Sequence, residues 1–222
     1  MPAPRRNSRV DRFHHERRLR LDGAAWIAGI DEAGRGPLAG PVVAAAVILP
    51  PAWIEEGMPG ELRELTDSKQ LTETQREEFF GLLTSNADVV IGLAECDAEL
   101  IDRINILQAT HLAMQRALAA LTRAPDHLLV DGRPVPPLPV GQTALVQGDS
   151  LSYSIAAASV IAKVTRDRQM QEWDRRHPEY GFAEHKGYGT PQHLAALATH
   201  GPCPIHRRSF APLKPVQGEL FR

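Results

Sequence analysis

The chain has 222 residues, enough for one domain with a substantial apolar core, and its formal net charge of −2 does not indicate a general nucleic-acid binder. No apolar stretch approaches the roughly 20 residues that a membrane-spanning helix needs, and no apolar signal core follows the basic N-terminus. The two cysteines, Cys96 and Cys203, lie far apart, which argues against a disulfide framework and favours a reducing compartment. We therefore expect a cytoplasmic protein that acts as a monomer.

The N-terminal segment is rich in arginine. Residues 5–20 carry seven arginines against Asp11 and Glu16. This pattern predicts a flexible, solvated basic extension over residues 1–22, which could also hold phosphates electrostatically. A single domain then spans residues 23–213, including a C-terminal helical part, and residues 214–222 form a loose tail.

Apolar runs and helix signals alternate along the rest of the chain. The predicted strands are residues 25–31, 42–49, 89–94, 127–130 and 143–146, and the predicted helices are residues 72–84, 97–121, 154–176 and 191–200. The first two strands predict an antiparallel pair, and the Pro/Gly-rich residues 50–65 predict a loop. Thr72 begins a capping box, Asp97 and Thr190 cap later helices, and the long 97–121 region can divide near Asn105. Intermixed strands and helices indicate an α/β fold.

Acidic residues follow the predicted strands at three separate places. Asp31 and Glu32 end the first strand, Asp131 follows the fourth, and Asp149 follows the fifth. Neighbouring side chains in a strand face opposite ways, so we expect the first strand to end near Asp31 and Glu32 and the turn to redirect one carboxylate. Each acid alone is more often a cap or turn former. Together they favour a site for Mg²⁺ or Mn²⁺, because carboxylates that converge without a cation repel one another.

Asp167 is a rival to Asp149 for the fourth position in this acidic set. The competing interpretation of Asp167 is a helical ion pair with Arg166 or Arg168.

A glycine-flanked arginine follows the first acidic pair. The turn Gly34-Arg35-Gly36 exposes backbone amides and one guanidinium beside the acids, although the same pattern also suits a simple tight turn. Tyr188 lies between two glycines, which suits an exposed ring that stacks on a nucleotide, against the alternative of a ring at the core edge. Candidate phosphate contacts, which could equally be solvated lysines, are Lys69, Lys163 and Lys186.

These motifs resemble ribonuclease HII in order and spacing. The resemblance extends from about residue 25 to residue 213. It is carried by residues 27–41, 66–69, 130–132, 147–150, 154–167, 186–190 and 206–210. It implies a ribonuclease H-like mixed five-stranded sheet flanked by helices, with a C-terminal helical segment.

The resemblance also implies an activity. A ribonuclease HII cleaves the RNA strand of RNA–DNA hybrids and incises 5′ to single ribonucleotides in duplex DNA, giving 3′-hydroxyl and 5′-phosphate ends. Asp31, Glu32, Asp131 and Asp149 would hold two divalent ions, Mg²⁺ or Mn²⁺, for two-metal-ion catalysis. The turn at Gly34, Arg35 and Gly36 would read the ribose 2′-hydroxyl, and Tyr188 would pack on the neighbouring deoxyribose. The alternatives are a structure-specific DNA nuclease such as a resolvase, and a non-catalytic clamp-associated binding module.

Two further patterns lie in the C-terminal part of the sequence. The spacing of His200, Cys203 and His206 suggests zinc, but the intervening prolines and the lack of a clear fourth ligand argue against it, so we expect no zinc site. His206-Arg207-Arg208 could bind phosphates or form internal ion pairs. Gln217, Leu220 and Phe221 resemble the short peptide by which bacterial replication proteins dock on the sliding clamp, against the alternative of a chance match.

Overall fold

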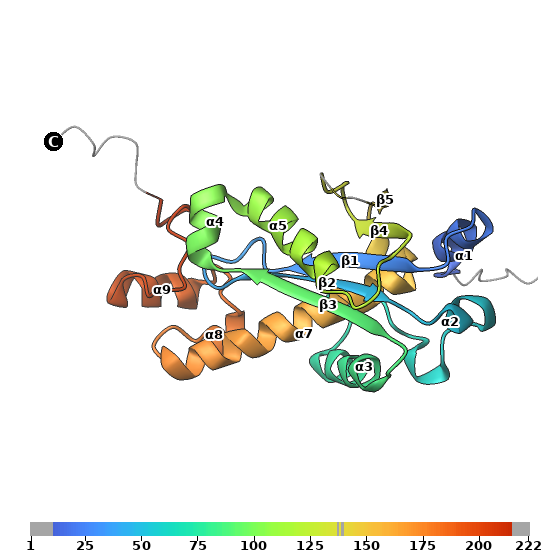
Figure 1. The fold of residues 1–222 in the computed structure, drawn as a ribbon. Coiled ribbons are helices and arrows are strands. Elements are labelled where there is room, and N and C mark those ends of the chain that lie inside the picture. The colour runs from blue at the N-terminus through green and yellow to red at the C-terminus, as the bar shows by residue number, and fades with distance from the viewer. Residues whose placement is uncertain (1–10, 137, 139, 215–222) are drawn as a thin grey trace, which may run out of the picture.

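A mixed five-stranded sheet forms the centre of the molecule (Figure 1). The structure is a computed structural model, and it describes residues 11–136, 138 and 140–214. The strands lie in the order β3-β2-β1-β4-β5. Their bounds are β1 Ile27–Ala33, β2 Val42–Ile48, β3 Val90–Cys96, β4 His127–Asp131 and β5 Gly141–Leu145. β1–β2 and β2–β3 pair antiparallel, as predicted for the first pair, whereas β4 runs parallel to β1 and to β5.

Helices cover both faces of this sheet (Figure 1). The bounds are α1 His14–Leu21, α2 Pro51–Glu56, α3 Glu73–Ser85, α4 Ala98–Ile104, α5 Ile106–Ala119, α6 Gly148–Leu151, α7 Tyr153–Arg176, α8 Phe182–His185 and α9 Pro191–His200. On one face, Ala45 and Val47 of β2 pack with the apolar side chains of α3 and α7. On the other, Ala44 and Ala46 pack with those of α5. The alternation of β2 side chains between two cores follows from the period of a strand.

Small residues let α7 lie against the backbone of β1. A Cβ atom added at Gly29 would lie 2.0 Å from the carbonyl carbon of Ser154, so only glycine fits there. Ala156, Ala157 and Ala158 of α7 are fully buried in the same contact region. This close approach brings the start of α7, and α6 just before it, next to the strand that carries the first acidic pair.

The N-terminal prediction is wrong for residues 11–22. Residues His14–Leu21 form a helix, Phe13 is buried, and the carboxyl group of Glu16 is fully buried. The sequence did not indicate this packing, because arginine charges dominate the composition of the segment and only a few of its side chains make buried contacts. Residues 1–10 and 215–222 lie outside the described residues.

Three further differences separate the prediction from the structure. The predicted loop at residues 50–65 contains α2 and a short 3₁₀ helix at Gly60–Leu62, because Pro51 occupies the first turn of a helix, where proline is tolerated. The 97–121 region divides at Asn105, which has a positive φ of 67° and caps α5. α8 and the single turn of α6 were not predicted. No helix within the described part of the chain is long and apolar enough to cross a bilayer.

Candidate functional site

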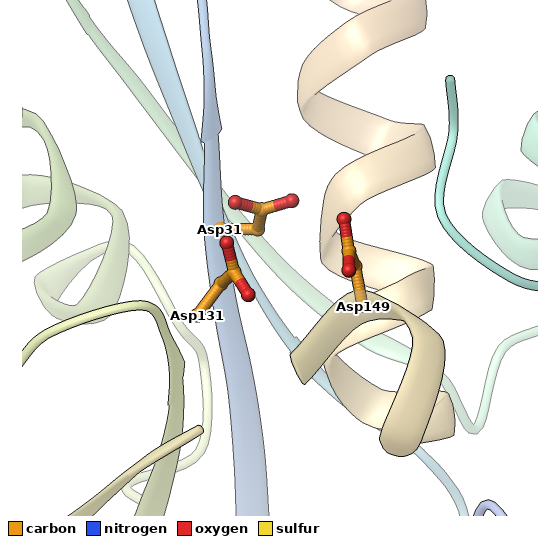
Figure 2. A group of neighbouring side chains, drawn as sticks. All are labelled: Asp31, Asp131 and Asp149. Atoms are coloured by element: carbon orange, nitrogen blue, oxygen red, sulfur yellow. The ribbon is translucent and has the colours of Figure 1, made fainter. Parts of the chain in front are cut away.

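Three carboxyl groups converge beside β1, the central strand of the sheet (Figure 2). One oxygen each from Asp31, Asp131 and Asp149 lies within 4.8 Å of the others, and this is the only such group of potential metal ligands among the described residues. Asp31 comes from β1 and Asp131 from the parallel strand β4, so the C-terminal parts of two parallel strands bring them together. Asp149 comes from α6, where the Gly148 amide donates to Asp131 Oδ1 at 2.7 Å.

Two carboxyl groups of this cluster, those of Asp31 and Asp149, resist ionisation. Burial, followed by the charges of Glu32 and Asp131, raises the pKa of Asp31 well above its usual range. Burial and the charges of Asp131 and Asp67 raise the pKa of Asp149 to about 6. A divalent cation removes this conflict by neutralising the charges, and oxygen-only donors suit a hard cation. The residues present therefore fit a divalent metal.

Glu32 follows Asp31 on β1 and lines a cavity together with Asp131. The strand continues through both acids and ends at Ala33, so it ends near them as predicted, but no turn redirects either carboxylate, and neighbouring strand positions face opposite ways. Glu32 pairs with Arg35 at 3.2 Å and is not one of the three converging groups. Burial raises the pKa of Glu32, and the Arg35 guanidinium opposes that rise.

The rival acid, Asp167, lies elsewhere. It pairs with Lys163 one helical turn earlier, at 2.7 Å, rather than with either neighbouring arginine. The structure thus places Asp149, and not Asp167, beside Asp31 and Asp131.

Two cavities of about 320 and 310 Å³ flank the end of β1, and Glu32 and Arg35 line both. The cavity on the α7 side, here called the turn cavity, is also lined by Gly34, Gly36, Lys69, Lys163 and Tyr188. The Tyr188 side chain is 47% exposed, so it is available to a ligand rather than part of the core. The turn cavity gathers the predicted turn and the predicted stacking residue in one place.

The predicted lysines differ in their surroundings. Burial acts to lower the pKa of Lys69, but the nearby carboxylates of Asp67 and Asp31 outweigh it and raise that pKa. Burial lowers the pKa of Lys163, and its ion pair with Asp167 opposes the change. Lys186 does not line either cavity, and its ammonium group contacts the carbonyl of Ala183.

Two buried arginines donate to carbonyl oxygens of the glycine turn and of the residues that follow it. Arg207 is fully buried and donates to the carbonyls of Gly34, Arg35, Pro37 and Gly40 at 2.5–3.0 Å. Arg166 donates to the carbonyls of Ala39, Pro41 and Lys186 at 2.9–3.0 Å. Burial lowers the pKa of Arg166 to about 10 and that of Arg207 to about 9. These hydrogen bonds from buried side chains fix the shape of the turn, which preorganises it to bind a ligand.

The loop that carries Tyr188 is held by a chain of histidines. The Cys203 amide donates to Nδ1 of His206, so His206 carries its proton on Nε2 and donates to Nε2 of His193 at 3.0 Å. Nδ1–H of His193 then donates to the carbonyl of Tyr188 at 2.9 Å. Both ring nitrogens of His206 are thus occupied by protein groups, and His200 is exposed at the surface.

Comparison with known proteins agrees with this geometry. The sequence profile described as ribonuclease HII matches residues 28–213. A ribonuclease HII from Geobacter sulfurreducens is 55% identical over 204 residues, which are 92% of this chain and 90% of that protein. One from Geobacillus kaustophilus is 56% identical over 204 residues, 92% of this chain and 75% of that protein.

The chain belongs to the ribonuclease HII family. It is therefore a nuclease that cleaves the RNA strand of RNA–DNA hybrids. The ribonuclease H2 from Pyrococcus horikoshii has the same fold, with a TM-score of 0.69 and 30% identity over 85% of this chain and 95% of that one. The ribonuclease HII of Archaeoglobus fulgidus, solved in a complex with PCNA, has a TM-score of 0.64 and 24% identity over 87% of this chain and 99% of that one. The predicted ribonuclease H-like mixed sheet is thus confirmed.

Some residues that shape this ribonuclease HII site were missed by the sequence analysis. Arg166 and Arg207 lie within the motifs that carry the family resemblance, but a sequence does not reveal that an arginine is buried against carbonyls. For Arg207, neither sequence interpretation holds within the described ranges, because its guanidinium is buried and donates to backbone carbonyls rather than to a carboxylate. Glu16 carried no signal at all, since it lies in a segment that predicts a solvated arm. Gln217, Leu220 and Phe221 lie outside the described residues.

Proposed function

We propose that this nuclease also incises duplex DNA 5′ to single embedded ribonucleotides, leaving 3′-hydroxyl and 5′-phosphate ends. The observation that carries the proposal is the turn cavity, where the exposed Tyr188 ring faces the same space as Gly34, Arg35 and Gly36. A 2′-hydroxyl is what distinguishes RNA from DNA at one sugar. A backbone turn and a ring on the same cavity could therefore contact a ribose and its deoxyribose neighbour together.

Asp31, Asp131 and Asp149 would hold divalent ions, with Glu32 completing the set from the other side of β1. When bound, two such ions lower the pKa of water and stabilise the leaving oxygen of a phosphodiester. Mg²⁺ and Mn²⁺ both suit oxygen donors, and the ribonuclease HIII of the same fold, 19% identical, was solved in complex with Mn²⁺.

The remaining cavity residues would position the nucleic acid. Arg35 is half-exposed and paired with Glu32, so it would present a positive charge to a phosphate next to the acids. Lys69 and Lys163 line the same cavity and would contact backbone phosphates. Lys186 contacts Ala183 instead, so we assign it no phosphate.

One assay tests this function. The substrate is a duplex with one ribonucleotide, incubated with Mg²⁺ or with Mn²⁺ and compared with an all-DNA duplex of the same sequence. We expect a single cut 5′ to the ribonucleotide and an intact control. Cutting of the all-DNA duplex would indicate a resolvase instead, and binding without cutting under either metal would indicate a non-catalytic module.

The C-terminal tail adds a proposed partner. Gln217, Leu220 and Phe221 match a clamp-docking peptide, and a structural neighbour is known in a PCNA complex. We therefore propose that the tail tethers a monomeric, cytoplasmic enzyme to the bacterial sliding clamp. The test is a pull-down of the clamp with the full chain and with a chain lacking residues 217–222. Equal recovery of the clamp would refute the tether.

A further inference from the structure

The segment that leads into α1 contacts the connection between α6 and α7 from two sides. The backbone carbonyl of Arg12 accepts from the Tyr153 amide at 3.0 Å, and the Arg12 guanidinium donates to the Ser150 carbonyl at 3.3 Å. Glu16 Oε1 accepts from Ser152 Oγ at 2.6 Å. These contacts surround residues 150–154, here called the α6–α7 joint, which begins directly after Asp149.

Glu16 is buried at a cost that its contacts must offset. Its side chain is fully buried, and no ion pair of Glu16 exists among residues of the described ranges. Its Oε1 also accepts from the Ser154 amide at 3.1 Å, near the start of α7. Burying a carboxyl group without a cation is unfavourable, and burial raises the pKa of Glu16 accordingly. The two hydrogen bonds that Glu16 accepts from Ser152 and Ser154 must therefore offset the cost of burying its carboxyl group.

The helix that carries Glu16 is itself firmly anchored. The Phe13 ring is buried against Tyr153, with ring centroids 4.8 Å apart. Arg17 donates to the Ile54 carbonyl at 2.8 Å. These contacts fix α1 to α2 and to the main apolar core, so Glu16 offers the joint a rigid acceptor rather than a mobile one.

Asp149 depends on this joint for its position. α6 is a single turn that starts after Gln147, which has a left-handed backbone, and ends at Ser152 in an extended conformation. The turn is held at its start by the hydrogen bond from the Gly148 amide to Asp131. At its end it is held through Ser152, whose hydroxyl also caps α7 by accepting from the Ile155 amide at 3.2 Å. A displacement of the joint would move Asp149 relative to the acids on the sheet.

We propose that Glu16 is a positioning residue that holds Asp149 at the carboxylate cluster. The inference rests on the proposed metal role of Asp31, Asp131 and Asp149. It gives the arginine-rich N-terminal segment a part in building the metal site, distinct from holding phosphates. Partners that orient metal ligands typically affect metal affinity by about 10–100-fold when removed.

The test measures Mn²⁺ affinity of the full-length protein by calorimetry, without substrate. Glu16→Leu introduces an apolar side chain of similar size and leaves both joint donors without an acceptor, so we expect the Mn²⁺ affinity to fall about tenfold. Glu16→Gln keeps the accepting oxygen and should retain most of the affinity. Arg18→Ala, on the exposed side of the same helix, is the matched control and should bind like the unmutated protein.

Kinetics separate positioning from substrate contact. On a hybrid substrate, Glu16→Leu should lower kcat at limiting Mn²⁺, recover at high Mn²⁺ and leave KM for the hybrid unchanged. A raised KM with unchanged Mn²⁺ affinity would overturn the proposal in favour of a phosphate-binding arm. Should Glu16→Leu fail to fold, Ser152→Ala removes the stronger of the two joint contacts and should also weaken Mn²⁺ binding.

A further variant distinguishes this inference from the proposed function. Asp149→Asn must weaken Mn²⁺ binding if Asp149 is a ligand. If it does not, the metal role of Asp149 fails, and the Glu16 inference fails with it. If Asp149→Asn weakens binding while Glu16→Leu stays within twofold of the unmutated protein, the metal site stands and Glu16 is not its positioning residue.

Discussion

At the scale of single residues, the carboxylate cluster combines groups that repel each other in the free protein. The pKa of Asp31 is raised by burial and by Glu32 and Asp131, and that of Asp149 is raised to about 6 by burial and by Asp131. Such an arrangement costs stability where function needs it. Removing one charge should therefore have opposite effects on catalysis and on folding.

The first residue-scale prediction concerns catalysis. Asp31→Asn should abolish cleavage of an RNA–DNA hybrid, because the variant removes a charge from the centre of the cluster, while hybrid binding stays nearly unchanged. The measurements are gel-based cleavage with Mg²⁺ and a binding titration without metal. Full activity in the variant would remove Asp31 from the site. Asp167→Asn, in the Lys163 pair outside the cluster, should retain cleavage and serves as the control.

The second residue-scale prediction concerns the thermal stability of the folded protein. In EDTA at about neutral pH, Asp149→Asn should raise Tm by about 2–4 °C, the change that roughly 1 kcal/mol gives in a chain of this size. A carboxyl group whose folded pKa is raised stabilises the fold below its unfolded pKa of 3.8, and that contribution is lost as pH rises through about 6. The gain from the variant should thus shrink below pH 4, as calorimetry at several pH values would show. An unchanged or lower Tm in EDTA would contradict the repulsion.

At the scale of elements, the glycine in the middle of β1 decides how closely α7 approaches the sheet. Gly29→Ala should destabilise the protein by about 1–3 kcal/mol or more, because its Cβ would lie 2.0 Å from the Ser154 carbonyl carbon. Gly81→Ala in α3, where a Cβ meets nothing within 4 Å, should instead stabilise by about 0.5–1 kcal/mol. Chemical denaturation measures the free energy of unfolding of both variants. If the β1–α7 contact were flexible, Gly29→Ala would be no less stable than Gly81→Ala.

Elements with strong local signals could be predicted from the sequence. The capping box at Thr72, the Asp97 cap and the Thr190 cap followed by Pro191 all mark true helix starts. β1 and β2 were recognisable as an antiparallel apolar pair. The reason is that caps and apolar periodicity act over a few residues, so a short window contains the whole cause.

Features that depend on long-range contacts could not be predicted in this way. α1 is stabilised by Phe13 and Glu16 packing on residues more than 100 positions later, so its local composition misleads. Asp149 was placed in the acidic set by its motif, but the choice between Asp149 and Asp167 stayed open, because it depends on how the α6 turn packs against β4. For Arg207, the deciding contacts are backbone carbonyls, which every sequence contains.

At the scale of the whole molecule, the histidine chain holds the Tyr188 loop, α9 and the segment around His206 together in the C-terminal part. Burial, followed by the neighbouring His193, lowers the pKa of His206 to about 4, and burial lowers the pKa of His193. The unfolded chain therefore binds more protons than the folded one between pH 6.5 and 4. The stability contributed by this chain is present above pH 6.5 and is lost as pH falls toward 4.

The corresponding prediction compares variants across pH. His206→Gln should be less stable than the unmutated protein at about neutral pH, and the difference in Tm should narrow as pH falls from 6.5 to 4. His200→Gln, at the exposed end of α9, is the control for replacing a histidine in the same part of the molecule. The measurement is thermal unfolding in a pH series. A gap for His206→Gln that stays constant with pH would show that the buried imidazole does not titrate as described.

The uninterrupted passage of β1 through two consecutive acids has a consequence for how this site can change. Adjacent positions on a strand alternate between its two faces. This alternation places Asp31 in the carboxylate cluster and leaves Glu32 to pair with Arg35. Inserting or deleting one residue between Ile27 and Ile30 would exchange the faces of the two acids, although the pair Asp31-Glu32 itself would be unchanged. The length of this stretch is therefore constrained as tightly as its chemistry, and Gly29 opposite Ser154 adds a second constraint on the same residues.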